Sequence, residues 1–196
     1  MSAVPDARTN VSLQEYLEMD AASEDLLEYH DGEVVAMSGG SYPHSDVTTR
    51  LLQALGPLLR GGPCKAQGPN LNVGNASRRR YVHPDATIHC GPPEFHQNDG
   101  SETLLVNPRV IFEVLSQSTE AYDRGEKAKI YREIPSLEEH FLLSQDRPEV
   151  EGYHRQEDGS WSLRLWSGHD AVAKIRCLGL DLPLAELYDA DEPTET

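Results

Sequence analysis

One short apolar run limits most strongly what this chain can fold into. The run from Val110 to Leu115 reads Val-Ile-Phe-Glu-Val-Leu, which predicts a β-strand that is buried within a sheet. Glu113 lies inside this run, where a carboxylate costs free energy unless another group compensates its charge. We therefore expect either a cationic side chain or a bound metal ion beside this strand.

Turn-forming residues divide the rest of the chain into further strands. Asp31-Gly32 lies between two β-prone runs and predicts a hairpin over residues 27–37. Residues 157–160 predict a second hairpin, between strands at residues 150–154 and 161–166. By the same criteria we expect four more strands, at residues 64–73, 86–90, 140–143 and 172–182.

Helical spacing of apolar residues marks three stretches. The first covers residues 11–19, and the second begins at a cap on Ser45 or Asp46 and continues to residue 58. The third covers residues 120–133. It carries three polar side chains at intervals of four residues, which therefore share one helix face: Asp123, Lys127 and Tyr131.

The length and composition are sufficient for one hydrophobic core. The chain has 196 residues, of which 38% are apolar, and it contains no internal repeat or linker. We expect one α+β domain over residues 11–188. A flexible N-terminus, residues 1–10, would precede this domain, and an acidic disordered tail, residues 189–196, would follow it.

The formal net charge of −16 disfavours binding of nucleic acid at long range. Binding of duplex DNA would need metal ions or a local basic patch. Arg78-Arg79-Arg80 is the only concentrated positive charge in the sequence, although a short run of this kind is usually a solvated loop. The charge therefore weakens a nucleic-acid function without excluding it.

Cysteine spacing and hydropathy indicate the cellular compartment. The three cysteines, Cys64, Cys90 and Cys177, are far apart and odd in number, and we expect reduced, mostly buried thiols. No segment reaches the roughly 20 apolar residues of a membrane span, and residues 1–10 lack a signal-peptide core. We expect a soluble, cytoplasmic protein without a membrane partner.

Asp85 and Glu113 have the chemistry of a site for a hard divalent cation. Mg²⁺ prefers oxygen ligands and usually takes one or two protein carboxylates together with water and substrate phosphate. If the two residues lie on neighbouring strands, their carboxylates converge and a metal ion relieves their repulsion. A metal ion would also explain the tolerated charge of Glu113.

The order of these motifs resembles the Uma-two-type restriction endonuclease family, a domain family of the PD-(D/E)XK nuclease superfamily. The resemblance covers residues 13–146. It rests on several spaced motifs in one order: Tyr29-His30-Asp31-Gly32-Glu33, His44, Pro84-Asp85, Glu113-Val114-Leu115-Ser116-Gln117-Ser118-Thr119, Asp123, Lys127 and Tyr131. Such a series is more specific than any one of its members.

The resemblance implies a restriction-endonuclease-like core, in which helices flank a mixed central sheet and additional hairpins lie at both ends. It implies that Asp85 and Glu113 hold Mg²⁺ or Mn²⁺, with the backbone carbonyl of Val114 as a further ligand. The superfamily usually places its lysine two residues after the glutamate, where this chain has Leu115. The resemblance therefore assigns the catalytic amine to Lys127 on the following helix.

Two further residues lie in motifs that the family shares. Glu33 would add a metal contact, and His44 would handle a proton or contact a phosphate. The implied activity is metal-dependent hydrolysis of DNA phosphodiester bonds, with the metal ion polarising the phosphate and Lys127 steadying negative charge.

Each site residue also has a structural interpretation. Asp85 is compatible with a turn or cap, and Glu113 with a buried salt bridge to Lys127 that has no catalytic role. Lys127 is compatible with a surface ion pair to Asp123, in which case Lys129 is the alternative amine. His44 is compatible with a simple helix cap.

Three alternatives for the function stay open at this stage. The first is a nuclease fold that acts as a noncatalytic binding or dimerisation module, which the acidic charge and Leu115 favour. The second is hydrolysis of another phosphate ester at the same site. The third is a nuclease that acts as a homodimer, or with another protein partner, to pool positive charge for DNA.

Overall fold

The computed structural model describes residues 8–37, 40–75, 77, 79–96 and 102–189. Most of the N-terminus and tail for which we expected disorder, and Arg78 of the arginine run, lie outside the described residues. At the edges of these segments, the backbone of Arg8 pairs with Val34, and Asp189 forms an ion pair with Arg50.

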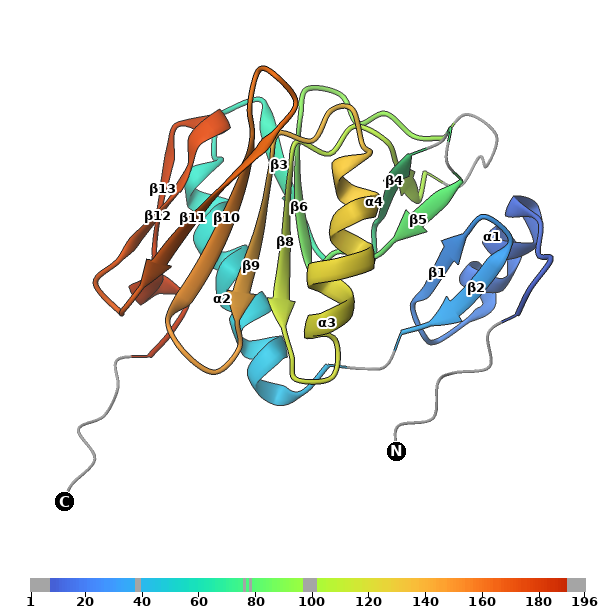
Figure 1. Cartoon of the computed structure of the whole chain (residues 1–196), viewed down its shortest axis with the longest axis horizontal. Coiled ribbons are helices and arrows are strands. Elements are labelled where there is room, and N and C mark those ends of the chain that lie inside the picture. Colours follow the sequence, from blue (N-terminus) through green and yellow to red (C-terminus); the bar gives the residue numbers. More distant parts are fainter. Residues whose placement is uncertain (1–7, 38–39, 76, 78, 97–101, 190–196) are drawn as a thin grey trace.

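A six-stranded mixed sheet lies at the centre of the molecule (Figure 1). Its order is β11-β10-β9-β8-β6-β3. The strands are β3 (Cys64–Gln67), β6 (Ala86–Cys90), β8 (Val110–Leu115), β9 (Glu139–Ser144), β10 (Glu149–Arg155) and β11 (Trp161–Ser167). Strand β8 is buried along its whole length, as its apolar sequence predicts. Its pairing with β9 is parallel, because a helical connection returns the chain to the same end of the sheet.

That connection is a helix with a wider turn in its middle. It consists of α3 (Glu120–Tyr122), the π-helical turn η2 (Asp123–Lys127) and α4 (Ala128–Arg132). The helix predicted over residues 120–133 is confirmed, and Asp123, Lys127 and Tyr131 are all buried. The π-helical turn was not predicted, and such turns are frequent at functional sites.

A second sheet has the order β2-β1-β5-β4-β7. Its strands are β1 (Leu27–His30), β2 (Glu33–Ala36), β4 (Asn72–Asn75), β5 (Arg80–Val82) and β7 (Leu104–Leu105). The predicted hairpin β1–β2 is confirmed, and both residues of its turn, Asp31 and Gly32, have positive φ. The prediction of one strand over residues 64–73 is wrong, because Gly68-Pro69 separates β3 from β4, which lie in different sheets.

The helices α1 (Leu13–Ala22) and α2 (Tyr42–Leu58) precede the central strands. Helix α1 begins with a capping box, in which Ser12 and Glu15 form reciprocal side-chain to backbone hydrogen bonds. The expected cap of α2 at Ser45 or Asp46 is wrong, since Ser41 is the N-cap and Pro43 fits into the first turn. Within the described residues, no helix is long and apolar enough to cross a bilayer.

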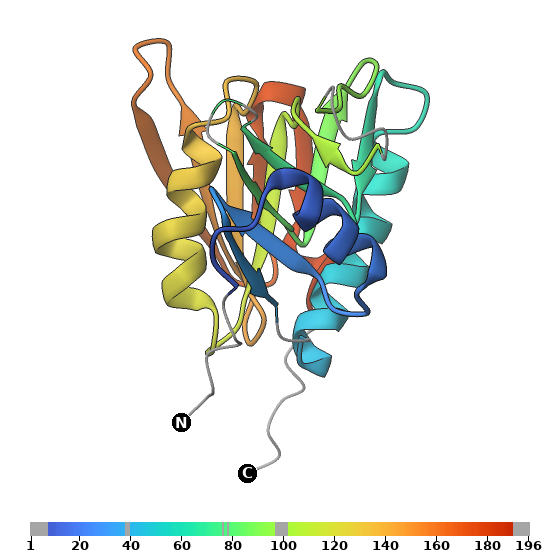
Figure 2. The ribbon, with the colours of Figure 1, turned by 90° about the vertical axis from the view of Figure 1, so that its right-hand side faces the viewer.

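Helices cover both faces of the six-stranded sheet. Figure 2 shows α2 on one side of the strands and the helix of α3, η2 and α4 on the other. The α2 side packs Leu51 and Leu55 against Phe112 and Val114, whereas the α4 side packs Ile111 into a second core. The second sheet contributes Val73, Val82 and Leu105 to this second core, so it packs against both α4 and β8.

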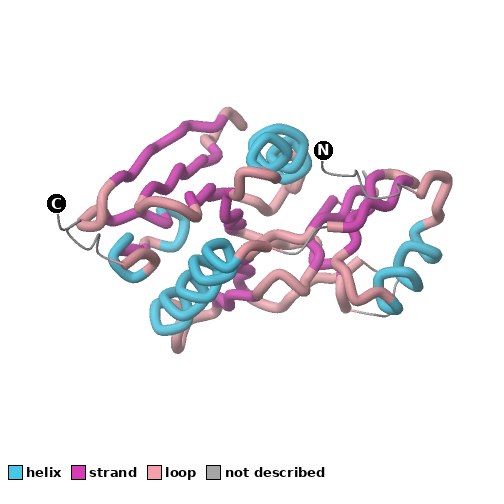
Figure 3. The backbone as a smooth tube through the Cα atoms, turned by 90° about the horizontal axis from the view of Figure 1, so that it is seen from below, coloured by secondary structure: helices cyan, strands magenta, loops and turns pink. Residues whose placement is uncertain are grey.

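The C-terminal part lies at the end of the molecule opposite α1, as the view from below in Figure 3 shows. The predicted second hairpin is confirmed as β10–β11. The prediction of a single strand over residues 172–182 is wrong. The segment forms a hairpin of β12 (Val172–Ile175) and β13 (Leu180–Pro183), which turns through the short helix η3 (Arg176–Leu178) and Gly179 at positive φ. A last short helix, η4 (Leu184–Glu186), follows.

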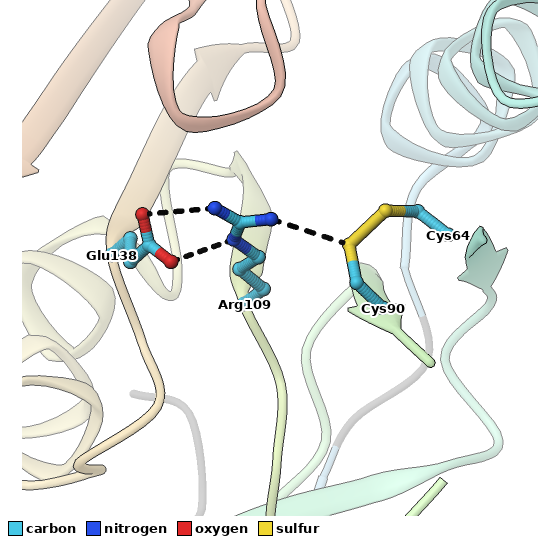
Figure 4. The surroundings of a disulfide bond; sticks show 4 residues. All are labelled: Cys64, Cys90, Arg109 and Glu138. Atoms are coloured by element: carbon cyan, nitrogen blue, oxygen red, sulfur yellow. Dashed lines mark hydrogen bonds and ion pairs between the residues drawn. A yellow bond between two sulfur atoms is a disulfide. The ribbon is translucent and has the colours of Figure 1, made fainter. Parts of the chain in front are cut away.

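The expectation of three reduced cysteines is wrong in the structure. Cys64 and Cys90 are opposite each other in the antiparallel pair β3–β6 and form a disulfide (Figure 4). Directly opposed residues of an antiparallel pair bring their Cβ atoms close together, so two cysteines 26 residues apart can be bridged. The guanidinium of Arg109 contacts Cys90 Sγ at 3.8 Å, and Cys177 is the free cysteine.

Candidate active site

Strand register brings Asp85 and Glu113 together. Strands β6 and β8 are antiparallel, with Ala86 opposite Phe112, so Asp85 lies opposite Glu113 at the next position. Residues that are opposite each other in such a pair point to the same face. The amide of Val114 donates a hydrogen bond to Asp85 Oδ2 at 2.7 Å, which fixes this carboxylate against the end of β8.

Lys127 lies beside Glu113, and Lys129 does not. The Nζ atom of Lys127 is 2.9 Å from Glu113 Oε1 and donates a hydrogen bond to the carbonyl of His83 at 2.7 Å. Lys127 is 2% exposed, whereas Lys129 is on the surface and pairs with Glu126. The structure therefore brings Lys127 into the site, in contact with the glutamate of the apolar strand.

Glu28 is a buried member of this cluster that the sequence analysis missed. Its Oε1 is 3.6 Å from Lys127 Nζ and accepts a hydrogen bond from the amide of His83 at 3.3 Å. The hydroxyl of Tyr122 donates to Glu28 Oε2 at 2.5 Å. A signal was present, because Glu28 also lies in an apolar run, Leu26-Leu27-Glu28-Tyr29, as Glu113 does.

Two more side chains of the π-containing helix complete the cluster. Asp123 Oδ1 is 3.8 Å from Lys127 Nζ, and the hydroxyl of Tyr131 donates a hydrogen bond to Glu113 Oε1. Lys127 thus has three carboxylates around it, from β1, from β8 and from its own helix. The structure therefore contains the salt bridge between Glu113 and Lys127. The catalytic role of either residue stays a prediction.

The structure brings His44 to the site and leaves Glu33 outside it. His44 lies in the first turn of α2, and its Nε2 is 3.1 Å from Asp85 Oδ2. Glu33 begins β2, is exposed, and is opposite His30 in the hairpin. The acid that this hairpin contributes to the cluster is Glu28. For Val114, the amide rather than the carbonyl contacts Asp85.

Asp85, Glu113, Asp123 and Lys127 form the floor of a cleft of about 1050 Å³. The N-terminal half of α2 and the segment after β8 form its walls, together with residues 24–26, Met37 and Pro69. Glu113 and Lys127 are each 2% exposed, and the side chain of Asp85 is 16% exposed. Asp85 is therefore the acid of the Asp85–Glu113 pair that is more accessible from the cleft.

Acids outnumber cations in this buried site. Burial raises the pKa of Glu113 well above its ordinary value, and the carboxylates of Asp85 and Asp123 raise it further against the opposing effect of Lys127. Burial likewise raises the pKa of Asp123. Without a further cation, Glu113 and Asp123 therefore tend to retain a proton.

Neighbouring carboxylates favour the charged forms of Lys127 and His44. Burial alone would lower the pKa of Lys127, but the surrounding carboxylates, first of all Glu113, raise it above its ordinary value. The hydrogen bond with Asp85 raises the pKa of His44. Lys127 is therefore a fixed cation and not a base, whereas His44 can hold a proton that it could transfer.

The donor set fits Mg²⁺ or Mn²⁺. Asp85 and Glu113 are hard oxygen donors on adjacent strands, and a cation between them would offset the excess of acid. In the part of the chain that the structure describes, no group of three or more His, Cys, Asp or Glu side chains forms a complete metal site. The protein would thus supply two carboxylates and leave the other coordination positions to water and substrate.

Known proteins are similar to this chain in sequence and in fold. The sequence model of the Uma2 family, described as "Putative restriction endonuclease", matches residues 13–185. An uncharacterized protein of Synechocystis sp. is 32% identical over 178 residues, which cover 91% of each chain. A second uncharacterized protein of the same organism is 29% identical over 157 residues, which cover 80% of this chain and 88% of its relative.

The structural comparison concerns the fold alone. The crystal structure of "a putative nuclease belonging to DUF820" from Anabaena variabilis superposes with a TM-score of 0.71 and covers 90% of this chain and 97% of that chain. The two sequences are 16% identical in this superposition.

Proposed function

The chain belongs to the Uma2 family, and on that premise we propose that it is a divalent-metal-dependent nuclease that hydrolyses DNA phosphodiester bonds. We also propose that its six-stranded sheet and flanking helices are a restriction-endonuclease-like core. The observation that carries the proposal is the convergence of Asp85, Glu113 and Lys127 on the floor of one cleft. These residues come from β6, β8 and the following helix, so the fold, and not sequence proximity, unites them.

Each residue has a role that follows from its contacts. Asp85 and Glu113 would hold Mg²⁺ or Mn²⁺, which supplies Lewis-acid polarisation of the phosphate and of water. Lys127, held protonated by its carboxylates, would stabilise negative charge on the phosphate in the transition state. His44 contacts Asp85 from the cleft wall and would give a proton to the leaving oxygen.

Tyr131 and Glu28 would hold these groups in place. The hydroxyl of Tyr131 donates to Glu113, and Glu28 is beside Lys127 on the side of the second sheet. The charge on Lys127 is therefore fixed in position by groups from both sheets. Such preorganisation is what makes electrostatic stabilisation effective in a buried site.

The test is cleavage of plasmid and linear DNA by purified protein with Mg²⁺, with Mn²⁺ or with a chelator. Wild type should cleave only with metal, and Asp85→Asn and Glu113→Gln should each lose at least about a hundredfold of the rate. Glu126→Gln and Lys129→Met are control variants, because this exposed pair lies on the helix that carries Lys127 but outside the cluster. Equal residual cleavage by wild type and Glu113→Gln would contradict the proposal.

Binding of metal separates the nuclease from the noncatalytic module. Calorimetry should detect Mn²⁺ binding to wild type and much weaker binding to Asp85→Asn. If metal binds but DNA is not cut, hydrolysis of bis(p-nitrophenyl) phosphate tests the alternative of another phosphate ester at the same site. If neither metal binding nor hydrolysis is found, the binding module is the better description.

A further inference from the structure

The cleft above the acids has few of the charges that bind duplex DNA. Among its described lining residues there is no arginine, and its one lysine, Lys127, is buried against carboxylates. Two exposed acids, Glu24 and Asp25, lie at its edge. Nonspecific binding of DNA gains affinity from Lys and Arg contacts to phosphates, and a duplex, with its higher charge density, depends on them more than a single strand does. The described lining of this cleft supplies no such contact at its surface.

Four apolar side chains line the cleft instead. Leu26 and Met37 lie side by side, because the amide of Met37 donates to the carbonyl of Leu26 at 2.8 Å. Leu52 of α2 and Pro69 also line the cleft. All four side chains are only partly buried, so apolar surface is open to the cleft. We call these four residues the apolar wall.

Neutral hydrogen-bonding side chains also line the cleft. Ser41 donates a hydrogen bond to Gln145 at 3.0 Å, and Ser45 and Gln117 are exposed beside them. A nucleobase has flat faces with little charge and edges that form hydrogen bonds. The combination of the apolar wall with neutral polar groups suits an unpaired base, whereas the faces and pairing edges of a base are hidden in a duplex.

The depth of the acids in the cleft also favours a substrate with unpaired bases. Glu113 is 2% exposed at the floor, so a scissile phosphate has to enter the cleft to approach it. A single strand can bend into such a cleft and place a base beside the phosphate. A duplex would have to open first, at a cost of a few kcal/mol.

We infer that the substrate of this site is single-stranded DNA, held with one unpaired base against the apolar wall and its phosphate above Asp85 and Glu113. This inference rests on the proposed nuclease function. It goes beyond that proposal because it selects one class of DNA by the chemistry of the cleft.

The experiment compares three labelled oligonucleotides of one sequence: a single strand, the blunt duplex, and a single strand with abasic positions at its centre. Cleavage is followed with Mn²⁺, and binding is followed by fluorescence anisotropy with Ca²⁺. The intact single strand should be cut and bound at least about tenfold better than the duplex. That ratio corresponds to burial of about 60 Å² of apolar surface. The abasic strand, with the same charge, should bind several-fold more weakly than the intact strand.

A matched pair of variants on one helix locates the effect. Leu52→Gln should reduce the preference for the intact over the abasic strand, whereas Leu58→Gln, six residues further on α2 and outside the cleft, should not. Melting temperatures of both variants check that each is folded. A duplex that is bound and cut as well as the single strand overturns the inference and leaves the nuclease proposal intact.

Failure of the nuclease proposal itself would give a different experimental result. If no DNA is cut with any metal, the nuclease proposal fails, and anisotropy still decides whether the cleft prefers the unpaired strand. Equal or absent binding of all three oligonucleotides would then overturn this inference as well.

Discussion

Glu113 on β8 and Glu139 on β9 are both 2% exposed in apolar strands of the same sheet, yet their surroundings differ. Oε1 of Glu139 accepts hydrogen bonds from His154 Nδ1 at 2.7 Å and from the amides of Arg176 and Cys177. Glu113 instead shares one lysine with two other acids and lies on the floor of a cleft.

The difference teaches how to tell a structural acid from a functional one. Burial alone does not separate them, since both glutamates are equally buried. Glu139 has three donors on its Oε1, and the amides of Arg176 and Cys177 among them hold the C-terminal hairpin to the sheet. Glu113 belongs to a group with more acids than cations, which is stable only if protons or a metal ion supply the missing charge.

The largest expected effect comes from removing the shared lysine. Lys127→Met leaves three buried carboxylates without their cation and should cost about 3–5 kcal/mol of unfolding free energy. The cleavage rate should fall by about a thousandfold. Urea denaturation and DNA cleavage measure the two losses. Lys129→Met should change stability by no more than about 0.5 kcal/mol.

A double variant checks the cause of that loss. Glu113→Gln combined with Lys127→Met should be more stable than Lys127→Met alone, because one uncompensated charge is removed. If the double variant is less stable than both single ones, the lysine acts mainly through packing, and the comparison of the two glutamates fails.

The two glutamates should respond oppositely to the same substitution. Glu139→Gln should cost about 1–3 kcal/mol, because it weakens the bonds to His154 and to two backbone amides. The cleavage rate per folded molecule should stay unchanged. Glu113→Gln should cost less stability without metal and should lower the cleavage rate by at least about a hundredfold. Similar losses of both stability and rate in the two variants would remove the distinction.

The stability of the metal-free protein should depend on pH through Glu113. The raised pKa of Glu113 means that the folded protein holds a proton that the unfolded chain releases near the ordinary value of 4.5. Stability of the metal-free protein should therefore fall as the pH rises from about 4.5 through the raised pKa, and Glu113→Gln should flatten this slope.

The same proton should couple to the metal ion. Mn²⁺ affinity should increase with pH over that window, with release of protons on binding. Calorimetry in two buffers of different ionisation enthalpy measures the number released. Proton release that is identical in wild type and Glu113→Gln would show that another group is titrating.

The smallest expected effect comes from Tyr122, whose hydroxyl contacts Glu28 on the side of the cluster that faces the second sheet. Tyr122→Phe removes the hydrogen bond to Glu28 Oε2 and should cost about 1 kcal/mol, with a few-fold decrease in cleavage rate. The contact of Glu28 with Lys127 remains, so the loss should be much smaller than that of Lys127→Met. Thermal denaturation and cleavage rates are sufficient to compare the two variants.

Local sequence patterns predicted the elements that carry the site. The apolar run of β8 predicted a buried strand that contains Glu113. Intervals of four residues predicted that Asp123, Lys127 and Tyr131 share one helix face. Asp31-Gly32 likewise predicted the first hairpin, because few residues tolerate the positive φ of that turn. Each of these features depends on residues that are close in the chain.

Features that depend on distant partners could not be predicted in this way. Glu28 joins the cluster only because the second sheet lies against the α3–α4 helix. The disulfide depends on the register of β3 against β6, and cysteine spacing alone does not reveal register. The early start of α2 at Ser41 was missed because Pro43 resembles a turn residue outside its context.

The number of residues in the π-helical turn η2 matters more than the identity of its exposed residues. Each α-helical residue advances about 100° around the helix axis. Deletion of Gly125, whose surroundings are sterically open, would shift Asp123 by about that angle relative to Lys127 and Tyr131. Natural variants of this turn should therefore exchange residues freely at its exposed positions but should not gain or lose one.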